Sequence, residues 1–237
     1  MTKVSGYKHS DGITYALGAT VVMEYLNHAE DMVEAVILHP DFKSEETIMK
    51  IHAICDGRIP VTTEEKPFNI LSKKDNCFVI AAVRKETQKI EPGNHMVLVC
   101  PSNAGNLGTI MRSCLGFGVR NIAIIPPAVD NYDPKVIRAS MGAAASVRVE
   151  IFDKFEDYAA EFPENNLYPF MLDGSSRLQD TKISAPYSLI MGNEATGLPA
   201  SFAGIGSPIR IEHSDSIDSL NITIAASIGL YEAAKTN

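Results

Sequence analysis

In its second part the chain alternates between short continuous apolar runs and segments whose apolar residues recur at helical spacing. Such runs are typical of buried strands, and the segments between them are typical of amphipathic helices. Strands are expected at 95–100, 121–126, 147–152, 167–174, 187–192 and 207–211, and helices at 106–117, 134–145, 155–162 and 219–235. Apolar strands separated by helices indicate a parallel sheet covered by helices on both faces. The pattern therefore predicts an α/β fold.

A smaller α/β pattern occupies the first part of the chain. Helices are expected at 14–27 and 44–55, the second capped by Ser44, and strands at 34–40, 58–63 and 77–83. The stretch 84–94 is charged, poor in apolar residues and ends in Pro-Gly, which is typical of a linker. We therefore expect a small α/β domain over residues 1–90 and a larger domain over 91–237.

Composition narrows the class of protein. Of the 237 residues 45% are hydrophobic, and no apolar run reaches the 18 residues of a membrane span. The start of the chain does not read as a signal peptide, and the four cysteines have no Cys-x-x-Cys spacing. These features favour a cytoplasmic protein with free thiols, without a metal site or a membrane. The net charge of −8 gives nucleic-acid binding no support, so an RNA substrate would need a local basic patch.

Ligands of parallel sheets bind at the carboxyl ends of the strands, where this chain has three notable loops. The first, NAGNLGTIMRSC at 103–114, lacks the Lys-Ser/Thr of a phosphate-binding loop and the Gly-x-Gly-x-x-Gly of a dinucleotide site. A tight turn explains Gly105 but not the polar set Asn103, Asn106 and Arg112. If the helix begins near Asn106, that residue is its cap, and Arg112 lies nearly two turns on, close to the same side.

The other two loops are ambiguous when each is taken alone. MGNEATGLP at 191–199 has glycines that would let a ligand approach the backbone, and Glu194 is either a polar anchor or a turn carboxylate. In the segment IRIEHSDSIDSLNITIA, at 209–225, Ser219 reads as a helix cap and Asn221 as a polar residue of the first turn.

Taken together, the three segments resemble the three signature motifs of the SpoU (TrmH-type) RNA ribose methyltransferases, in order and in spacing. The resemblance covers about residues 94–235, and the first part of the chain resembles the ribosomal-protein-like substrate-binding domain of that family. It implies a SPOUT fold with a C-terminal trefoil knot, and a homodimer formed through the knotted domain. It also implies transfer of a methyl group from S-adenosylmethionine to a ribose 2′-hydroxyl of RNA, with rRNA favoured over tRNA.

The resemblance also implies roles for individual residues. The catalytic set is Arg112, Asn106, Glu194, Ser219 and Asn221. The residues that line the methyl donor are Gly192, Ile211, Leu220, Met191 and Leu172. A guanidinium stays protonated, so Arg112 is expected to stabilise the forming alkoxide and to orient a phosphate rather than to act as a base.

The chain departs from its relatives at three places. Relatives commonly have Ile-Pro-Met where this chain has Ile211-Glu212-His213, glycine where it has Asp215, and His-Gln-Gly where it has Asn76-Cys77-Phe78. His213 reads as a local substitution rather than as a catalytic base. These departures put donor affinity and RNA contacts of the first domain in question, whereas the positions that carry chemistry are intact.

Two other functions remain open. A knotted protein that binds RNA or a nucleotide without transferring a methyl group would keep the fold, although degraded motifs would be expected of it. A dinucleotide-dependent oxidoreductase is opposed by the missing glycine fingerprint. If the substrate is RNA, a basic rim is expected to form from Arg112, Arg120, Arg138, Arg148, Arg177 and Lys182.

Overall fold

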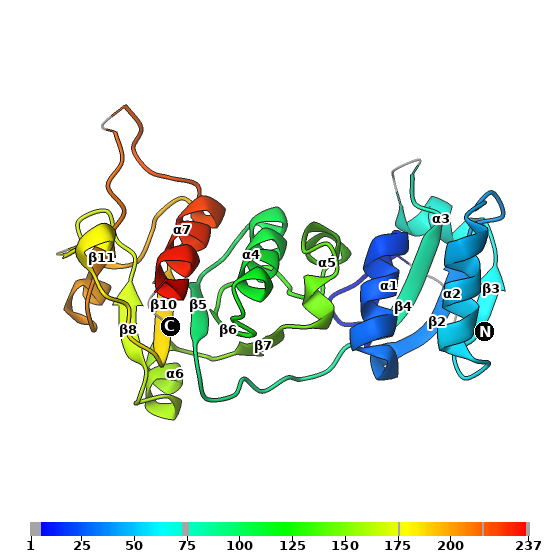
Figure 1. The fold of residues 1–237 in the computed structure, drawn as a ribbon, viewed down its shortest axis with the longest axis horizontal. Helices are drawn as coiled ribbons and strands as arrows, with labels where there is room; N and C mark the ends of the chain where they lie inside the picture. The colour runs from blue at the N-terminus through cyan, green and yellow to red at the C-terminus, as the bar shows by residue number, and fades with distance from the viewer. Residues whose placement is uncertain (1–5, 73–75, 175, 215, 236–237) are drawn as a thin grey trace. The chain divides into compact units, whose positions relative to one another are not determined.

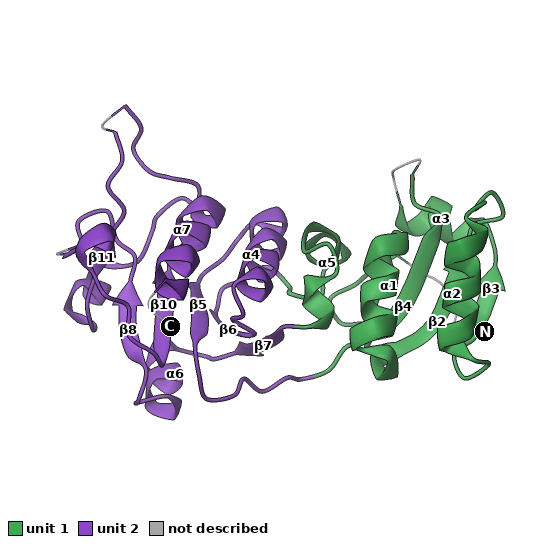
Figure 2. Cartoon of the chain, viewed as in Figure 1, with its two compact units in different colours: residues 1–86, 130–146 green, residues 87–129, 147–237 purple. Residues whose placement is uncertain are grey.

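The computed structural model describes residues 6–72, 76–174, 176–214 and 216–235. The chain divides into two compact units, one of residues 1–86 and 130–146 and one of residues 87–129 and 147–237 (Figure 2). The segment 130–146 therefore packs with the first unit, although the sequence pattern assigned it to the second domain. Its helix α5 (Pro134–Ala139) buries Val136 and Ile137, and Ile137 lies in the core of the first unit.

The first unit contains a four-stranded sheet in the order β1-β4-β2-β3. The strands β1 (Ile13–Leu17) and β2 (Val33–Leu38) run antiparallel to β4 (Val79–Arg84), and β3 (Val61–Thr63) runs parallel to β2. The other helices are α1 (Ala19–His28), α2 (Glu45–Cys55) and α3 (Lys66–Leu71), with 3-10 turns at Glu30–Met32 and Ala143–Ala145. Residues 13–17 form a strand and not the start of a helix, which corrects the prediction. Gly18, at φ +102°, separates this strand from α1.

The second unit contains the predicted parallel sheet (Figure 1). Its strands, in the order β7-β6-β5-β10-β8, are all parallel to their neighbours. They are β5 (His95–Val99), β6 (Asn121–Ile125), β7 (Arg148–Ile151), β8 (Asn166–Pro169) and β10 (Tyr187–Met191). A parallel pair of two-residue strands, β9 (Ser176–Arg177) and β11 (Ile209–Arg210), lies outside this sheet. Short 3-10 helices occupy Leu178–Asp180 and Ala200–Gly204.

Helices cover both faces of this sheet, as predicted. The helices α4 (Ala104–Gly116) and α7 (Ile222–Ala234) pack against each other, and α7 packs on β10. On the opposite face α6 (Phe155–Glu161) buries Phe155 and Tyr158 in a core with Val97 and Ala123. Figure 1 shows α4 and α7 on one side of the strands and α6 on the other. In the part of the chain that the structure describes, no helix is both long and apolar enough to cross a bilayer.

Apart from Arg84, the last residue of β4, the predicted linker forms no helix or strand, but its second half is anchored to the second unit. Ile90 is buried, and its backbone N–H donates to the Glu150 carboxylate at 2.9 Å. Lys89 pairs with the same carboxylate, and the backbone N–H of Glu91 donates to Asn121 at 3.1 Å. Because Glu150 is itself buried, these partners satisfy a charge that would otherwise be costly inside the protein.

A buried polar network lies where the strands of the second unit begin. His95 Nε2 donates to the carbonyl of Glu91 at 2.8 Å, so Nδ1 of the neutral ring accepts from the Tyr158 hydroxyl at 2.8 Å. The Tyr158 hydroxyl also contacts Ser188 Oγ at 2.5 Å, and Asn165 donates to that oxygen at 3.0 Å. Burial lowers the pKa of His95. This end of the sheet is therefore structural, and the site has to be sought at the carboxyl ends of the strands.

Candidate active site

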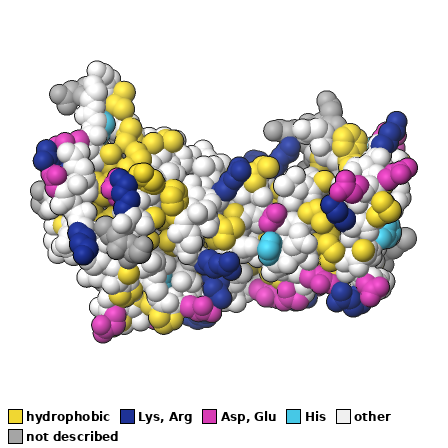
Figure 3. All heavy atoms as spheres, in the orientation of Figure 1, with side chains coloured by type: hydrophobic (Ala, Val, Ile, Leu, Met, Phe, Trp, Pro, Cys, Tyr) yellow, Lys and Arg dark blue, Asp and Glu magenta, His cyan; other side chains and the backbone are white. Residues whose placement is uncertain are grey.

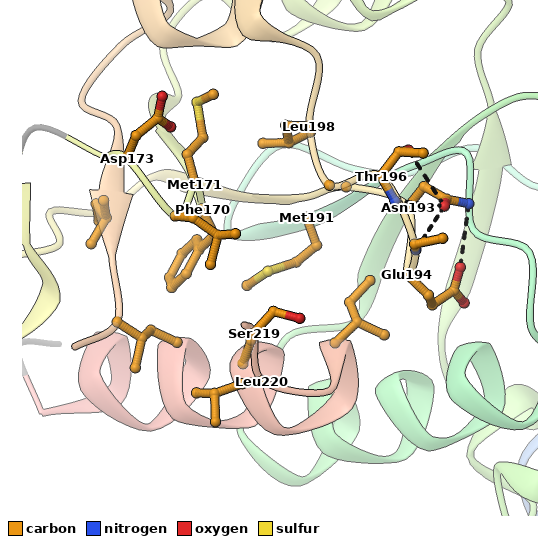
Figure 4. Close-up of a pocket in the computed structure, with 18 of the residues that line it drawn as sticks. Phe170, Met171, Asp173, Met191, Asn193, Glu194, Thr196, Leu198, Ser219 and Leu220 are labelled. Carbon is orange, nitrogen blue, oxygen red and sulfur yellow. Dashed lines mark hydrogen bonds between the residues drawn. The ribbon is translucent and has the colours of Figure 1, made fainter. Parts of the chain in front are cut away.

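The second unit contains a cavity of about 470 Å³ at the carboxyl ends of β8 and β10 (Figure 4). It is lined by the segments 170–173 and 191–198, by Ile209, Ile211 and His213, by Ser219 and Leu220 before α7, and by Ile222 and Ala225 of α7. Two of the three predicted loops therefore meet in one cavity. Most of the lining side chains are apolar, and the polar ones include Asp173, Glu194 and Ser219.

The cavity brings together part of the predicted site. All five residues expected to surround a donor line it: Leu172, Met191, Gly192, Ile211 and Leu220. Glu194 and Ser219 of the catalytic set line it too. Asn106, Arg112 and Asn221 are not among its lining residues.

The loop after β10 is held in shape by its own hydrogen bonds. The Asn193 side-chain oxygen accepts from the backbone N–H groups of Ala195 and Thr196, at 2.9 and 3.2 Å. Its amide donates to the carbonyl of Cys100, the residue directly after β5, at 2.8 Å. A Cβ at Gly192 would lie 2.2 Å from the backbone carbon of Gly197, so no larger residue fits at position 192. The sequence pattern did not single out Asn193, although an asparagine directly after a glycine at a strand end is a turn signal.

Glu194 joins this loop to the start of α4. Its carboxylate accepts from Ser102, through the backbone N–H at 3.0 Å and Oγ at 2.8 Å, and from the backbone N–H of Asn103 at 3.0 Å. Asn106 Nδ2 donates to it at 3.2 Å. Partial burial raises the pKa of Glu194, but the hydrogen bonds from Ser102 and Asn106 outweigh that effect and hold the pKa below its usual value. A carboxylate at a helix N-terminus is also favoured by the helix dipole.

The cap of α4 is Asn103 and not Asn106. The helix begins at Ala104, and the Asn103 side chain accepts from the backbone N–H of Asn106 at 3.1 Å. The side chain of Asn106 is therefore free of capping and binds Glu194 instead. The expectation that Asn106 caps the helix is wrong because the helix begins two residues earlier than its apolar pattern indicates.

The cap of α7 is likewise displaced from its predicted position. Asn221 caps this helix by accepting from the backbone N–H and the hydroxyl of Thr223, at 2.8 and 2.7 Å. Ser219 lies two residues before the cap, exposed at the edge of the cavity. Figure 4 shows Ser219 and Leu220 together where the chain enters α7. The hydroxyl of Ser219 is therefore not committed to the helix.

Arg112 lies on the exposed side of α4 and makes no ion pair with any residue that the structure describes. The residue after it, Ser113, contacts Ser227 of α7 through their hydroxyl oxygens, 2.9 Å apart. This contact fixes α4 against the helix whose start lines the cavity.

Of the six residues expected to form a basic rim, two are in ion pairs and a third belongs to the first unit. Arg148 pairs with Glu91 at 2.9 Å, Arg177 pairs with Asp180 at 2.5 Å, and Arg138 belongs to α5 of the first unit. In the view of Figure 3, Lys and Arg side chains are interspersed with Asp and Glu. Within the ranges that the structure covers, no group of three or more His, Cys, Asp or Glu side chains could hold a metal ion.

The segment that departs from the family pattern contributes His213 to the cavity. His213 Nδ1 lies 2.9 Å from the carbonyl oxygen of Ile211. Between them Glu212 turns outward and lies 3.6 Å from Arg177 and 3.7 Å from Arg210. Asp215, the second departure, is outside the described residues.

Comparison with known proteins places this site in a family. A 23S rRNA (uridine(2479)-2′-O)-methyltransferase of Streptomyces viridochromogenes is 32% identical over 57% of this chain and 50% of its own length. A putative tRNA (cytidine(34)-2′-O)-methyltransferase of Listeria innocua is 29% identical over 60% of this chain and 87% of its own length. The crystal structure of an AdoMet-bound rRNA methyltransferase from Sinorhizobium meliloti has a TM-score of 0.79 at 23% identity. It covers 94% of this chain, which is matched to 87% of that protein.

The chain spans about half the length of the first two curated relatives that it matches. The model of the SpoU rRNA methylase family matches residues 93–231, a range that contains all three predicted motifs and every residue that lines the cavity. The chain therefore belongs to the SpoU rRNA methylase family.

Proposed function

We propose that this protein transfers a methyl group from S-adenosylmethionine to a ribose 2′-hydroxyl of structured RNA. The observation that carries the proposal is the cavity, in which five residues expected around the donor meet two of the expected catalytic set. The family match and the AdoMet named for the Sinorhizobium meliloti structure support the same ligand.

The cavity suits S-adenosylmethionine, which combines a flat base with a charged amino-acid end. Met191, Leu198 and Leu220 offer apolar contacts, and the backbone near Gly192 and Ile211 offers hydrogen-bonding groups without intervening bulk. The volume of about 470 Å³ lies within the range of small-molecule sites, roughly 300–1,000 Å³. When bound, the donor supplies an electrophilic methyl group.

The side chains of the protein are proposed to stabilise the reacting oxygen and to position the substrate. Arg112 stabilises the developing negative charge on the ribose oxygen and orients a phosphate, because a planar guanidinium donates two parallel hydrogen bonds. Asn106, Ser219 and Asn221 position the ribose and the arginine. Glu194 holds the donor-side loop on the start of α4, since its oxygens already accept four hydrogen bonds there. It is therefore a positioning residue and not a base.

Ribosomal RNA is the favoured substrate, and the first unit is proposed to bind it. The relative whose name includes tRNA matches 60% of this chain, and the match takes up 87% of the relative's own length. The structure named for an rRNA methyltransferase matches 94% of the chain, a share that extends into both units. A location in the cytoplasm is proposed with this substrate.

A homodimer through α4 and α7 completes the proposal. Phe117, Ile224 and Tyr231 are exposed at 39%, 51% and 53%, and the rings of Phe117 and Tyr231 lie 6.4 Å apart. Figure 3 shows hydrophobic side chains gathered on this face of the second unit. An apolar patch of this kind marks an interface.

The trefoil knot is proposed on the packing of the segment before α7 against the segment after β8. Met171 donates its backbone N–H to the carbonyl of Ile209 at 2.9 Å. A Cβ at Gly229 of α7 would lie 2.7 Å from the Phe170 ring, and one at Gly174 would lie 2.5 Å from the backbone of Ile209. At Gly174 the two segments lie so close that only glycine fits, which supports the proposed crossing.

The test is transfer of labelled methyl groups from S-adenosylmethionine to purified rRNA by the full chain. We expect label in ribose, and no label when the target nucleotide carries a 2′-deoxyribose. Binding of S-adenosylmethionine and RNA without transfer would favour the non-catalytic alternative, and binding of NAD in place of S-adenosylmethionine would favour the oxidoreductase.

A further inference from the structure

His213 is the one imidazole among the described residues that line the cavity. It is half-buried, and it stands where relatives commonly have methionine. Neither the transfer chemistry nor the α4–loop contacts use it. Its role therefore has to follow from its own hydrogen bond and from what it faces.

The hydrogen bond to Ile211 fixes the protonation pattern of the ring. A carbonyl oxygen can only accept, so Nδ1 of His213 carries a proton and donates it across 2.9 Å. In the neutral ring Nε2 is then an acceptor, and the described residues offer it no hydrogen-bond partner. The carbonyl at the other end belongs to Ile211, which lines the same cavity.

Ion pairs flank this hydrogen bond outside the cavity. Glu212 lies 3.6 Å from Arg177 of β9 and 3.7 Å from Arg210 of β11, the two strands of the parallel pair. These side chains are exposed, so the pairs contribute little to stability.

We propose that His213 is a recognition residue for the methyl donor: its neutral imidazole accepts a hydrogen bond from an N–H group of the bound S-adenosylmethionine. This inference rests on the proposed function. Both the purine amine and the amino-acid ammonium of the donor are N–H groups.

Other ionisable groups also face or flank the ring. Asp173 and Glu194 line the same cavity, and Arg177, Asp180, Arg210 and Glu212 form the ion pairs beside it. Their effect on binding is common to the wild type and to any His213 variant. The comparison between variants therefore isolates the imidazole.

The experiment is calorimetric binding of S-adenosylmethionine to the full chain at pH 8.0, without RNA. His213→Gln keeps an acceptor near the position of Nε2, whereas His213→Leu removes the acceptor. We expect wild-type affinity for His213→Gln and a loss of about three- to tenfold for His213→Leu. His52→Gln, an exposed histidine of the first unit, is the matched control and should follow the wild type.

Three ligands separate the sources of the effect. S-adenosylhomocysteine lacks the sulfonium charge, so a loss of affinity in His213→Leu that is confined to S-adenosylmethionine identifies a charge effect alone and overturns the hydrogen bond. Adenosine retains the purine amine and S-inosylhomocysteine lacks it, so these two identify which N–H group is bound. Equal affinity of His213→Leu and the wild type at pH 8.0 would overturn the proposal. No binding by the wild type at pH 8.0 would instead contradict the proposed function.

Discussion

The amide of Asn106 donates to the carboxylate of Glu194 across 3.2 Å, although the two residues lie 88 positions apart. One belongs to the helix that carries Arg112, and the other belongs to the loop that lines the cavity. With the three hydrogen bonds from Ser102 and Asn103, this contact joins the start of α4 to the loop after β10. A single carboxylate therefore holds the loop that lines the cavity against the helix that carries Arg112.

Replacing Glu194 with Gln tests that connection. An amide has one acceptor oxygen in place of two, and its N–H₂ group would face the N–H donors of Ser102 and Asn103. We expect the free energy of unfolding to fall by about 1–3 kcal/mol and donor binding to weaken. Chemical denaturation and calorimetry measure both. Glu46→Gln, at an exposed ion pair with Lys50, is the control and should leave the free energy of unfolding unchanged. Unchanged stability in Glu194→Gln would refute the connection.

Replacing Arg112 with Ala tests the assignment of the oxyanion-stabilising group. Arg112 is exposed on α4 and does not line the cavity, so donor binding should be retained. The rate of methyl transfer should fall at least about a hundredfold, because one preorganised donor to the developing charge is lost. Arg112→Lys should recover little, since a point charge does not replace the planar fork. Lys154→Ala removes one positive charge from the same unit and is the control. Wild-type turnover by Arg112→Ala would contradict the assignment of Arg112 as the oxyanion-stabilising group.

The buried histidine His95 should make the stability depend on pH. Burial lowers its pKa, so the unfolded chain binds a proton at a higher pH than the folded protein does. The stabilisation that neutral His95 contributes is complete above about pH 6.5, the usual pKa of histidine. It is lost as the pH falls from there toward the folded-state pKa. The difference in unfolding free energy between the wild type and His95→Gln should therefore narrow between pH 8 and pH 5. A difference that is constant over this interval would contradict the buried neutral state.

Replacing Ile224 with Glu tests the proposed dimer. Ile224 is 51% exposed on α7, and a carboxylate there would be buried without a partner in the dimer. We expect the dissociation constant of the dimer to rise at least about tenfold in sedimentation experiments. Met49→Glu changes an apolar residue of the first unit that is 65% exposed, and it should leave the association unchanged. Equal dissociation constants for the two variants would show that Ile224 does not lie in the dimer interface.

The sequence predicts the parallel sheet of the second unit well, because buried strands appear as uninterrupted apolar runs. It fails where two elements merge into one apolar stretch. Residues 13–17 continue into α1 without a polar break, and only the backbone of Gly18 shows the boundary. It also fails for α5, whose apolar residues pack on the first unit, since periodicity does not reveal which sheet a helix covers.

The cavity is predicted better than the helix caps. The residues expected around the donor line one cavity, because loops at the carboxyl ends of neighbouring strands converge. The predicted caps, Asn106 and Ser219, are wrong. The observed caps are Asn103 and Asn221, which are also of residue types that cap helices and lie close to the predicted ones in the chain. The roles of Arg112, Asn106 and Asn221, which do not line the cavity, stay predictions until a substrate RNA is bound.

The most direct test of the central claim is a map of ribose methylation in total RNA from cells with and without this protein. The account predicts that a 2′-O-methyl group of rRNA is lost without the protein, returns with the wild-type chain and does not return with Arg112→Ala. Identical maps in the presence and absence of the protein would contradict the claim that it is an RNA ribose methyltransferase.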